Sequence, residues 1–259
     1  MTAGRLALRV CALGFLAALL VVPIGMVFHR AFEPGLGAVW ASVTTPEAQH
    51  AFFLTCLVVG IAVPLNAIFG VATAWLLVRK RFPGRRLLDA IVDLPFAVSP
   101  VVVGLALILV WGQGGWLDVG IRVIFSTPGI VLATVFVSLP FVVREVAPVL
   151  REEGIDQEQA AETLGASRLQ AFRRITLPTI RWGLAYGVIL TTARALGEFG
   201  AVSIVSGKVA GRTETLTLYV EQRFQGFDVA GAYAAAVVLA LLAVGVLLLM
   251  TLLQRDREN

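Results

Sequence analysis

Six long apolar stretches are the feature that most constrains how this chain can fold. A lipid bilayer has a hydrocarbon core of about 30 Å, which a helix of about 20 residues crosses. The six stretches come close to that length, and we expect each of them to form one transmembrane helix. Their ranges are 8–28, 52–78, 91–111, 129–148, 182–204 and 232–253. The predicted fold class is therefore an all-α membrane protein with six transmembrane helices.

The composition agrees with a chain that lipid solvates over most of its length. Of its 259 residues, 58% are hydrophobic and 15% are charged, which is too apolar for an ordinary soluble domain. No Ser-rich, acidic or repeated region interrupts the stretches, so we expect a single transmembrane domain over residues 1–259. The first stretch ends at His29 and Arg30 without a small-residue cleavage site, and we expect it to be retained as a helix.

The distribution of Lys and Arg predicts the orientation of the helices. Cytoplasmic loops carry an excess of these residues, and 15 of the 21 fall on one side of the six-helix arrangement. That side holds both termini, the cluster at 79–86 and the loop at 149–181. Both termini are therefore predicted to be cytoplasmic. The same excess accounts for the net charge of +4 without a nucleic acid as partner.

The loop at 149–181 is too polar to cross a membrane and too regular to be a loose linker. Two apolar helical faces follow each other in it, first Ala160, Ala161 and Leu164, then Leu169, Phe172 and Ile175. Gly165 is placed between them to end the first helix. The pattern predicts two short surface helices. Periodicity alone leaves two interpretations open, because such faces lie on a membrane surface or dock into a groove of a partner protein.

The residues of this loop also match a family motif. The matching positions, within 156–178, are Gln159, Ala160, Ala161, Leu164, Gly165, Ala166, Ile175, Leu177 and Pro178. They closely resemble the EAA loop of bacterial ATP-binding-cassette importer permeases, which begins Glu-Ala-Ala, continues to a Gly four residues later and ends Ile-x-Leu-Pro. Gln159 replaces the usual Glu, so an ion pair made by that Glu is lost or displaced to a flanking acid. Gln keeps the length and hydrogen-bonding capacity needed for docking.

The resemblance implies that the loop is a coupling helix, held in a cleft of a cytoplasmic ATPase dimer whose closure it transmits to the transmembrane helices. It also implies the MetI-like fold of binding-protein-dependent permeases. The chain lacks an ATPase motif of its own, because Val202 stands where a P-loop ending at Lys208 needs its first Gly. We therefore expect a transport subunit and not an enzyme. No cofactor or metal is expected on this chain, and ATP and Mg²⁺ are used by the partner ATPase.

Four further runs, at 82–85, 93–104, 140–145 and 193–201, extend the similarity over almost the whole chain. They resemble the sulfate/thiosulfate permease pair, above all its W-type subunit. Molybdate permeases share the last run, so a molybdate or tungstate importer stays open as an alternative. The resemblance implies a multi-pass protein embedded in the lipid of the bacterial inner membrane. Its implied partners are a periplasmic sulfate-binding protein and a homologous T-type permease subunit, or a second identical copy in the molybdate case.

Arg194 is the charge that fits least well with a transmembrane helix. It lies about 12 residues into the fifth stretch, roughly 18 Å along the helix and near mid-membrane. Such a charge is costly and usually faces the bundle interior or a water-filled path. Glu198 follows one turn later on the same face. Two compatible interpretations stay open, a structural ion pair and a place in the pathway of the oxyanion.

Ser99 is a weaker candidate for the same pathway. It lies between Pro95 and Pro100 within the third apolar stretch. A proline can open a helix where it lines a cavity. We expect a packing kink there. Gly197 and Gly200 are expected to let helices approach closely.

Two other classes of protein fit the sequence less well. A secondary transporter driven by an ion gradient needs no dedicated coupling loop. A membrane-embedded enzyme needs a cluster of metal ligands or a nucleophile with its base, which His29 and His50 do not provide. The external segment 206–231 carries charges of both signs and is either a solvated loop or, as the resemblance implies, a docking surface for the binding protein.

Overall fold

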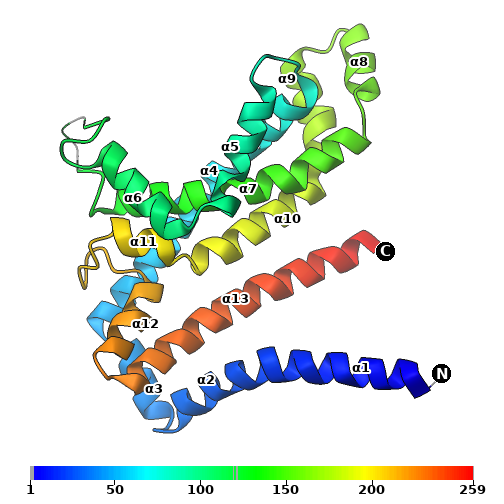
Figure 1. Cartoon of the computed structure of the whole chain (residues 1–259). Coiled ribbons are helices and arrows are strands. Elements are labelled where there is room, and N and C mark those ends of the chain that lie inside the picture. Colours follow the sequence, from blue (N-terminus) through cyan, green and yellow to red (C-terminus); the bar gives the residue numbers. More distant parts are fainter. Residues whose placement is uncertain (1–2, 119, 121, 259) are drawn as a thin grey trace.

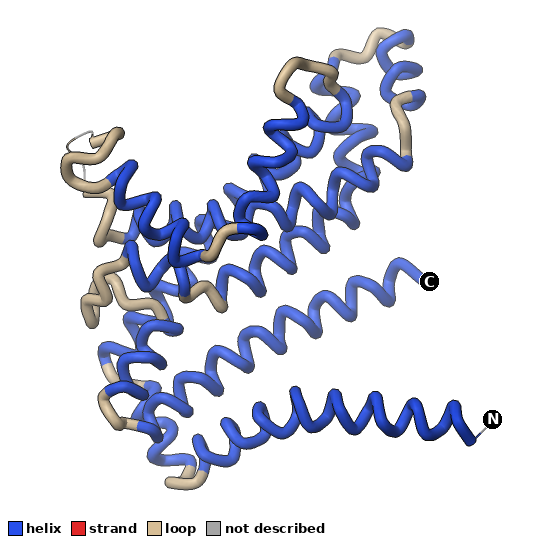
Figure 2. Tube along the Cα trace, viewed as in Figure 1, coloured by secondary structure: helices blue, strands red, loops and turns tan. Residues whose placement is uncertain are grey.

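A computed structural model describes residues 3–118, 120 and 122–258 of the chain. Over these residues the chain is helical with connecting loops and contains no β-strand (Figure 1, Figure 2), so the all-α prediction is confirmed. The first helices are α1 (Ala3–Leu16), a π-helical turn (Ala17–Val21), α2 (Val22–Phe32), α3 (Leu36–Val43), α4 (Pro46–Arg79), α5 (Arg85–Ala97) and α6 (Pro100–Trp111). They are followed by α7 (Thr127–Glu152), α8 (Asp156–Thr163), α9 (Arg168–Ala171), a second π-helical turn (Phe172–Thr176), α10 (Leu177–Leu196), α11 (Gly200–Val205), α12 (Leu216–Gln225) and α13 (Val229–Glu258).

Four segments are long and apolar enough to cross a membrane, namely Leu8–Phe32, Pro46–Arg79, Thr127–Glu152 and Val229–Val246. A fifth crossing results if α5 and α6, which meet at an angle of 118°, count as one span. α10 is not among them, because it carries Arg181 and Arg194 and several polar residues in only 20 residues.

The predicted third helix, 91–111, is not continuous. α5 ends at Ala97 and α6 begins at Pro100, and between them Val98 and Ser99 have extended backbone angles (ψ 136° and 134°). A residue that precedes proline is pushed out of the helical region by steric contact with the proline ring. The structure therefore corrects the expected kink to a complete break.

The predicted fifth helix, 182–204, is also interrupted. α10 ends at Leu196 and α11 starts at Gly200. Gly197 does not allow a close helix approach as expected, because its nearest neighbour for an added Cβ is the Ala193 carbonyl oxygen of its own helix at 3.8 Å. Gly200 does, since a Cβ there would lie 2.7 Å from the Cβ of Pro100. The two breaks therefore pack against each other.

Small residues bring α4, α7 and α10 together into the core of the molecule. A Cβ on Gly70 of α4 would lie 2.6 Å from Val142 Cβ, and one on Gly187 of α10 would lie 2.9 Å from Val142 Cα. Gly183, one turn before Gly187, meets the Glu145 carbonyl in the same way at 2.9 Å. Within lipid, close backbone contact of this kind is a main source of helix association. α4 and α10 therefore lie directly against α7.

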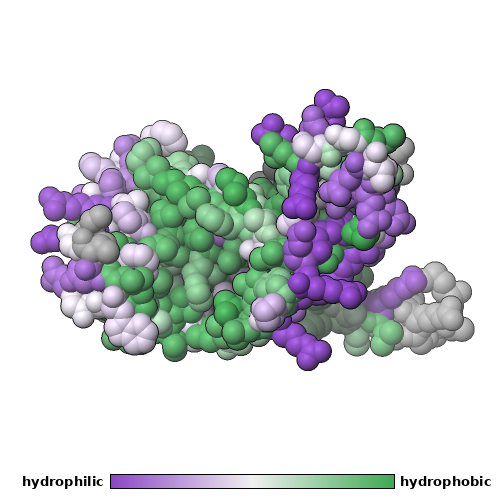
Figure 3. All heavy atoms as spheres, turned by 90° about the horizontal axis from the view of Figure 1, so that it is seen from above, coloured by the Kyte–Doolittle hydropathy of each residue, from purple (hydrophilic) through white to green (hydrophobic). Residues whose placement is uncertain are grey.

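The molecule has two hydrophilic ends and a broad hydrophobic middle (Figure 3). The N- and C-terminal ends of the chain point toward the same side as α8 and α9, while the loop after α6 lies at the other (Figure 1). Large exposed side chains of α1, α2 and α13, such as Phe15, Ile24 and Leu248, cover the middle. This distribution is the one expected for a protein that crosses a bilayer.

Candidate functional site

The predicted coupling loop begins with α8, and Gly165 ends it as expected. The Ala166 N–H donates to the Ala161 carbonyl and the Gly165 N–H to the Glu162 carbonyl, both at 3.0 Å, which is the Schellman pattern of a helix C-terminus. Gly165 has φ +86°, a left-handed conformation that only Gly adopts without cost. Glycine suits this position of the motif because the turn requires a left-handed backbone conformation.

The second half of the loop differs from the expected short surface helix. Ser167 and Gln170 cap the start of α9 through two reciprocal hydrogen bonds of 3.3 and 2.8 Å. The helix then passes through the π-helical turn into α10 with helical backbone angles at each junction. Phe172 packs partly buried against the core of α4, α7 and α10. This half is therefore the first part of the long α10 helix, and Leu177 and Pro178 lie where α10 proper begins.

The residues of the matched motif divide into an exposed and an inward-facing group. Gln159 and Ala160 of α8 are exposed, as is Leu164 directly after the helix, which is 88% accessible. Ala161, Ala166 and Ile175 are half-buried. Leu164 thus presents a large apolar side chain to the outside of the chain next to the exposed residues of α8.

Glu158 fixes α8 to the rest of the molecule. Its Oε1 atom accepts hydrogen bonds from Arg79 Nη2 at 3.1 Å and from Thr176 Oγ1 at 2.8 Å. Arg79, the last residue of α4, also donates to the Leu150 carbonyl at 2.8 Å. The Arg79 side chain is 8% accessible and that of Glu158 is 20%. The Glu158 carboxylate thus joins α8 to the end of α4 and to the π-helical turn before α10, and Arg79 in turn joins α4 to α7. The sequence did not indicate these contacts, and it left open whether the ion pair expected at position 159 is lost or displaced to a flanking acid.

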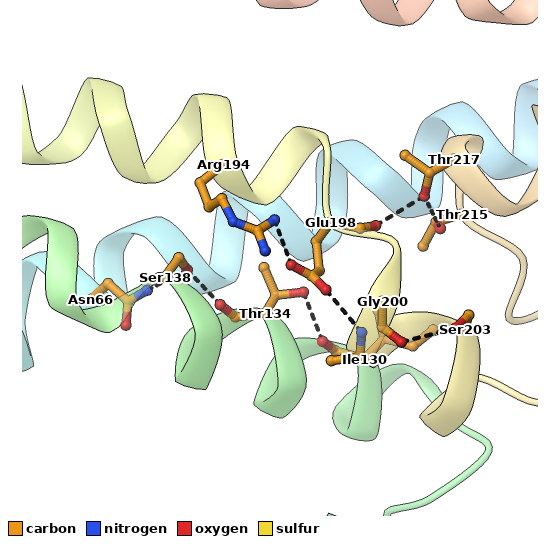
Figure 4. Close-up of polar contacts among 11 residues, drawn as sticks. Asn66, Ile130, Thr134, Ser138, Arg194, Glu198, Gly200, Ser203, Thr215 and Thr217 are labelled. Atoms are coloured by element: carbon orange, nitrogen blue, oxygen red, sulfur yellow. Dashed lines mark hydrogen bonds and ion pairs between the residues drawn. The ribbon is translucent and has the colours of Figure 1, made fainter. Parts of the chain in front are cut away.

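Arg194 and Glu198 form an ion pair of 2.6 Å at the end of α10 (Figure 4). Glu198 is almost fully buried, and its Oε1 accepts a hydrogen bond of 2.9 Å from the Ala201 N–H at the start of α11. Its carbonyl accepts a further bond of 2.9 Å from Thr217 Oγ1. The Arg194 side chain stays 32% accessible. Glu198 therefore holds the break between α10 and α11 in place, while part of the guanidinium remains open.

A row of polar side chains continues from this pair along α4 and α7 (Figure 4). Asn66 Nδ2 donates to Ser138 Oγ at 2.8 Å, Ser138 donates to the Thr134 carbonyl, and Thr134 donates to the Ile130 carbonyl at 2.9 Å. Within the described part of the chain, Asn66 Oδ1 and Thr191 Oγ1 are buried without a hydrogen-bond partner. We did not identify Asn66 or Ser138 from the sequence; the signal available was a single polar residue inside an apolar run.

Ser99 lies at the other break and is exposed. The close contact between Pro100 and Gly200 brings the α5–α6 and α10–α11 breaks together. A Cβ on Gly104 of α6 would likewise lie 2.8 Å from Ile204 Cβ of α11. Of the predicted pathway residues, Ser99 therefore lies at the α5–α6 break, and Arg194 and Glu198 lie at the α10–α11 break that packs against it.

Arg144 of α7 anchors α5, a contact that sequence reasoning missed. Its Nη2 lies 2.9 Å from Asp89 Oδ1 and 2.6 Å from Asp93 Oδ2, and its Nε donates to Asp93 Oδ1 at 2.8 Å. The bidentate geometry to Asp93 is the strong form of this interaction. α5 is thereby tied to the core, while α6 beyond the break packs on α11.

Most charges of the segment 206–231 are paired or buried. Lys208 pairs with Glu221 at 2.7 Å and Arg223 with Asp228 at 3.2 Å. Glu214 is not part of a solvated surface as expected, because it is 1% accessible. Burial raises the pKa of the Glu214 carboxyl, nearby Glu47 raises it further, and Arg223 and His50 oppose the rise.

Glu158→Ala is expected to loosen α8 without unfolding the chain. Removing a charged hydrogen-bond acceptor costs about 1.5–3 kcal/mol, so backbone amides in 156–163 should exchange with deuterium about tenfold faster or more. Hydrogen exchange with mass spectrometry measures this in the purified protein. Glu162→Ala, at an exposed position one turn later, is the matched control and should leave the exchange rate unchanged. Equal exchange in the two variants would contradict the tether.

The sequence matches the family model described as "Binding-protein-dependent transport system inner membrane component" over residues 66–259. It is 49% identical to the sulfate transport system permease protein CysW of Synechocystis sp., over 94% of this chain and 90% of that protein. The CysW protein of Escherichia coli is also 49% identical, with 94% and 85% covered. The sulfate transport system permease protein CysT of Salmonella typhimurium is 41% identical, with 92% and 87% covered.

The fold is similar to that of a solved structure. A bacterial ABC transporter described as involved in the import of the acidic polysaccharide alginate contains a chain that superposes with a TM-score of 0.80 at 17% identity. The superposition covers 97% of this chain and 95% of that one. The two chains therefore share the same overall fold over nearly their whole length.

Proposed function

The chain belongs to the family of binding-protein-dependent transport system inner membrane components, and from this membership we propose that it is a membrane-spanning subunit of an ATP-driven sulfate and thiosulfate importer. The observation that carries the proposal is its similarity, over nearly its whole length, to sulfate transport system permease proteins. The chain is a multi-pass permease of the inner membrane. It is the transport component of the complex and not the enzyme.

The greater identity with the CysW proteins than with the CysT protein supports the W-type position in a pair of different subunits. The partner that completes the pathway is then a homologous T-type permease. A molybdate importer, the alternative, would instead pair this chain with an identical copy. A periplasmic sulfate-binding protein delivers the cargo, and the exposed parts of the segment 206–231 are the proposed docking surface.

Six crossings with both termini in the cytoplasm form the proposed topology. The four long apolar helices, the bent pair of α5 and α6, and α10 together make six. α10 is acceptable as a crossing despite its charges, because Arg194 is paired and Gly183 and Gly187 bury the helix against α7. The excess of Lys and Arg on the α8 side supports the orientation.

In the proposed mechanism, the ATPase dimer binds the exposed face of Gln159, Ala160 and Leu164. ATP and Mg²⁺ are bound by the ATPase dimer, and this chain needs no cofactor. Because Glu158 joins α8 to α4 and α10, displacement of α8 is passed to the core helices instead of being absorbed in a flexible loop. The core then alternates between outward and inward access.

The proposed pathway runs past Arg194, Glu198 and Ser99. An oxyanion dianion is attracted by the accessible part of the Arg194 guanidinium, which has more donors than Glu198 uses. Glu198 lowers the local positive potential, so that the anion is not trapped. An ion-gradient-driven transporter is the rival from a different class, and it gives no role to the exposed surface of α8.

Uptake of labelled sulfate by cells that depend on this chain tests the proposed function. Uptake should require ATP and should be blocked by thiosulfate but not by low molybdate. Uptake blocked mainly by trace molybdate would change the cargo and keep the architecture. Uptake that is indifferent to ATP depletion would overturn the importer itself.

Leu164→Ala is expected to uncouple the ATPase. A buried apolar anchor at an interface contributes about 2 kcal/mol or more, so ATPase docking should weaken roughly 30-fold while the permease stays folded. Co-purification of the ATPase and ATP-driven uptake measure the two effects. Glu162→Ala, at an exposed position of α8 that lacks an apolar side chain, is the control and should behave as the wild type. Normal docking of the Leu164 variant would show that α8 is not the contact surface.

Charge removal at Arg194 and Glu198 separates the structural from the transport role. Each single variant, Arg194→Gln or Glu198→Gln, leaves one charge unpaired and should lower the amount of complex in the membrane. The double variant removes both charges and should restore that amount. If Arg194 binds the anion, uptake by the double variant stays about tenfold low, since a charged hydrogen bond contributes about 1.5–3 kcal/mol. Uptake restored to the wild-type level would leave the pair a structural role only.

A further inference from the structure

We propose that the chain binds an anionic phospholipid of the cytoplasmic leaflet in a cleft between α4 and the α9–α10 helix. The cleft has a volume of about 790 Å³. Ala67, Ile68 and Trp75 of α4 line one wall, and Leu169 and Phe172 line the other. The walls are almost wholly apolar, which suits acyl chains.

The cleft lies at the depth of acyl chains near one membrane surface. Ala67 is 12 residues before Arg79, the end of α4, so the cleft reaches roughly 18 Å from that end. Trp75 lies nearer the end, where tryptophan marks the boundary between hydrocarbon and headgroups. The placement in the cytoplasmic leaflet rests on the orientation proposed above.

Two cations lie at or beside the cleft, and none of the residues that line the cleft is acidic. Arg168 is exposed, lines the cleft and forms no ion pair with any residue in the described ranges. Lys80 is also exposed, and its Nζ lies 5.3 Å from the centre of the Trp75 ring. An anionic phosphate headgroup above the apolar cleft would satisfy both cations.

Charge also argues against the N-terminal helix of a second copy as the occupant. That segment carries Arg5 and Arg9 at the end that would meet Arg168 and Lys80, so like charges would gather at the rim. A lipid brings the opposite charge. The cleft wall includes Leu169 and Phe172, which follow the Gly165 turn at the end of α8. A bound lipid would therefore hold α9 against α4.

Native mass spectrometry of the complete complex, after reconstitution in equal amounts of phosphatidylglycerol and phosphatidylcholine, tests this site. The wild type should retain phosphatidylglycerol preferentially. The double variant Lys80→Gln/Arg168→Gln should lose that preference roughly tenfold, because each cation adds attraction to an anionic lipid. Arg173→Gln, an exposed cation of the same helix that does not line the cleft, is the control and should keep it.

A steric variant tests the apolar part independently. Ala72→Trp places a ring into the cleft and should reduce retention of phosphatidylglycerol, whereas Ala106→Trp, exposed on α6, should not. A photo-reactive residue at position 68 should label lipid. Labelling of the partner permease, or equal retention of the two lipids by the wild type, would overturn the proposal. Lipid retention is measured without transport, so a wrong cargo assignment would leave this result unaffected.

Discussion

The cost of an unpaired backbone polar group in lipid is the constraint on which the rest of this structure depends. A single segment that crosses the bilayer is therefore a helix, because a helix satisfies its backbone hydrogen bonds within itself. Irregular backbone is tolerated only where protein covers it. The two breaks, at 98–99 and 197–199, lie against each other. Pro100 packs on Gly200, and the Glu198 side chain accepts the hydrogen bond of the Ala201 N–H. The break at 197–199 is thus satisfied from within the protein, whereas Ser99 at the other break stays exposed.

A second consequence is that α4, α7 and α10 are packed closely into one unit. Gly70, Gly183 and Gly187 remove the side chains that would keep α4, α7 and α10 apart, and closely packed interiors transmit displacement with little deformation. The bidentate contact between Arg144 and Asp93 adds α5 to this unit. Because Glu158 joins α8 to Arg79 at the end of α4 and to Thr176 just before α10, the proposed coupling surface is connected directly to this packed unit.

The sequence predicted what depends on neighbouring residues and missed what depends on distant ones. Four of the six helix positions followed from apolar length, the Gly165 turn from local geometry, and the Arg194–Glu198 pair from one-turn spacing. Glu158 and Arg79, in contrast, are 79 residues apart, and Arg144 and Asp93 are 51 apart. No periodic pattern relates such residues. The break at Ser99 was taken for a kink because a proline alone does not reveal whether a neighbouring helix will cover an opened backbone.

The geometry of Arg194 and Glu198 explains how a structural pair can also serve transport. Glu198 is buried and uses its second oxygen to cap α11, so its charge must be balanced whether or not an anion is present. Arg194 supplies that balance through one nitrogen and remains about one-third accessible. A guanidinium has five N–H donors, so an arriving dianion need not break the pair to bind. The ion pair therefore balances the buried Glu198 charge while part of the Arg194 side chain remains accessible for the proposed contact with an anion.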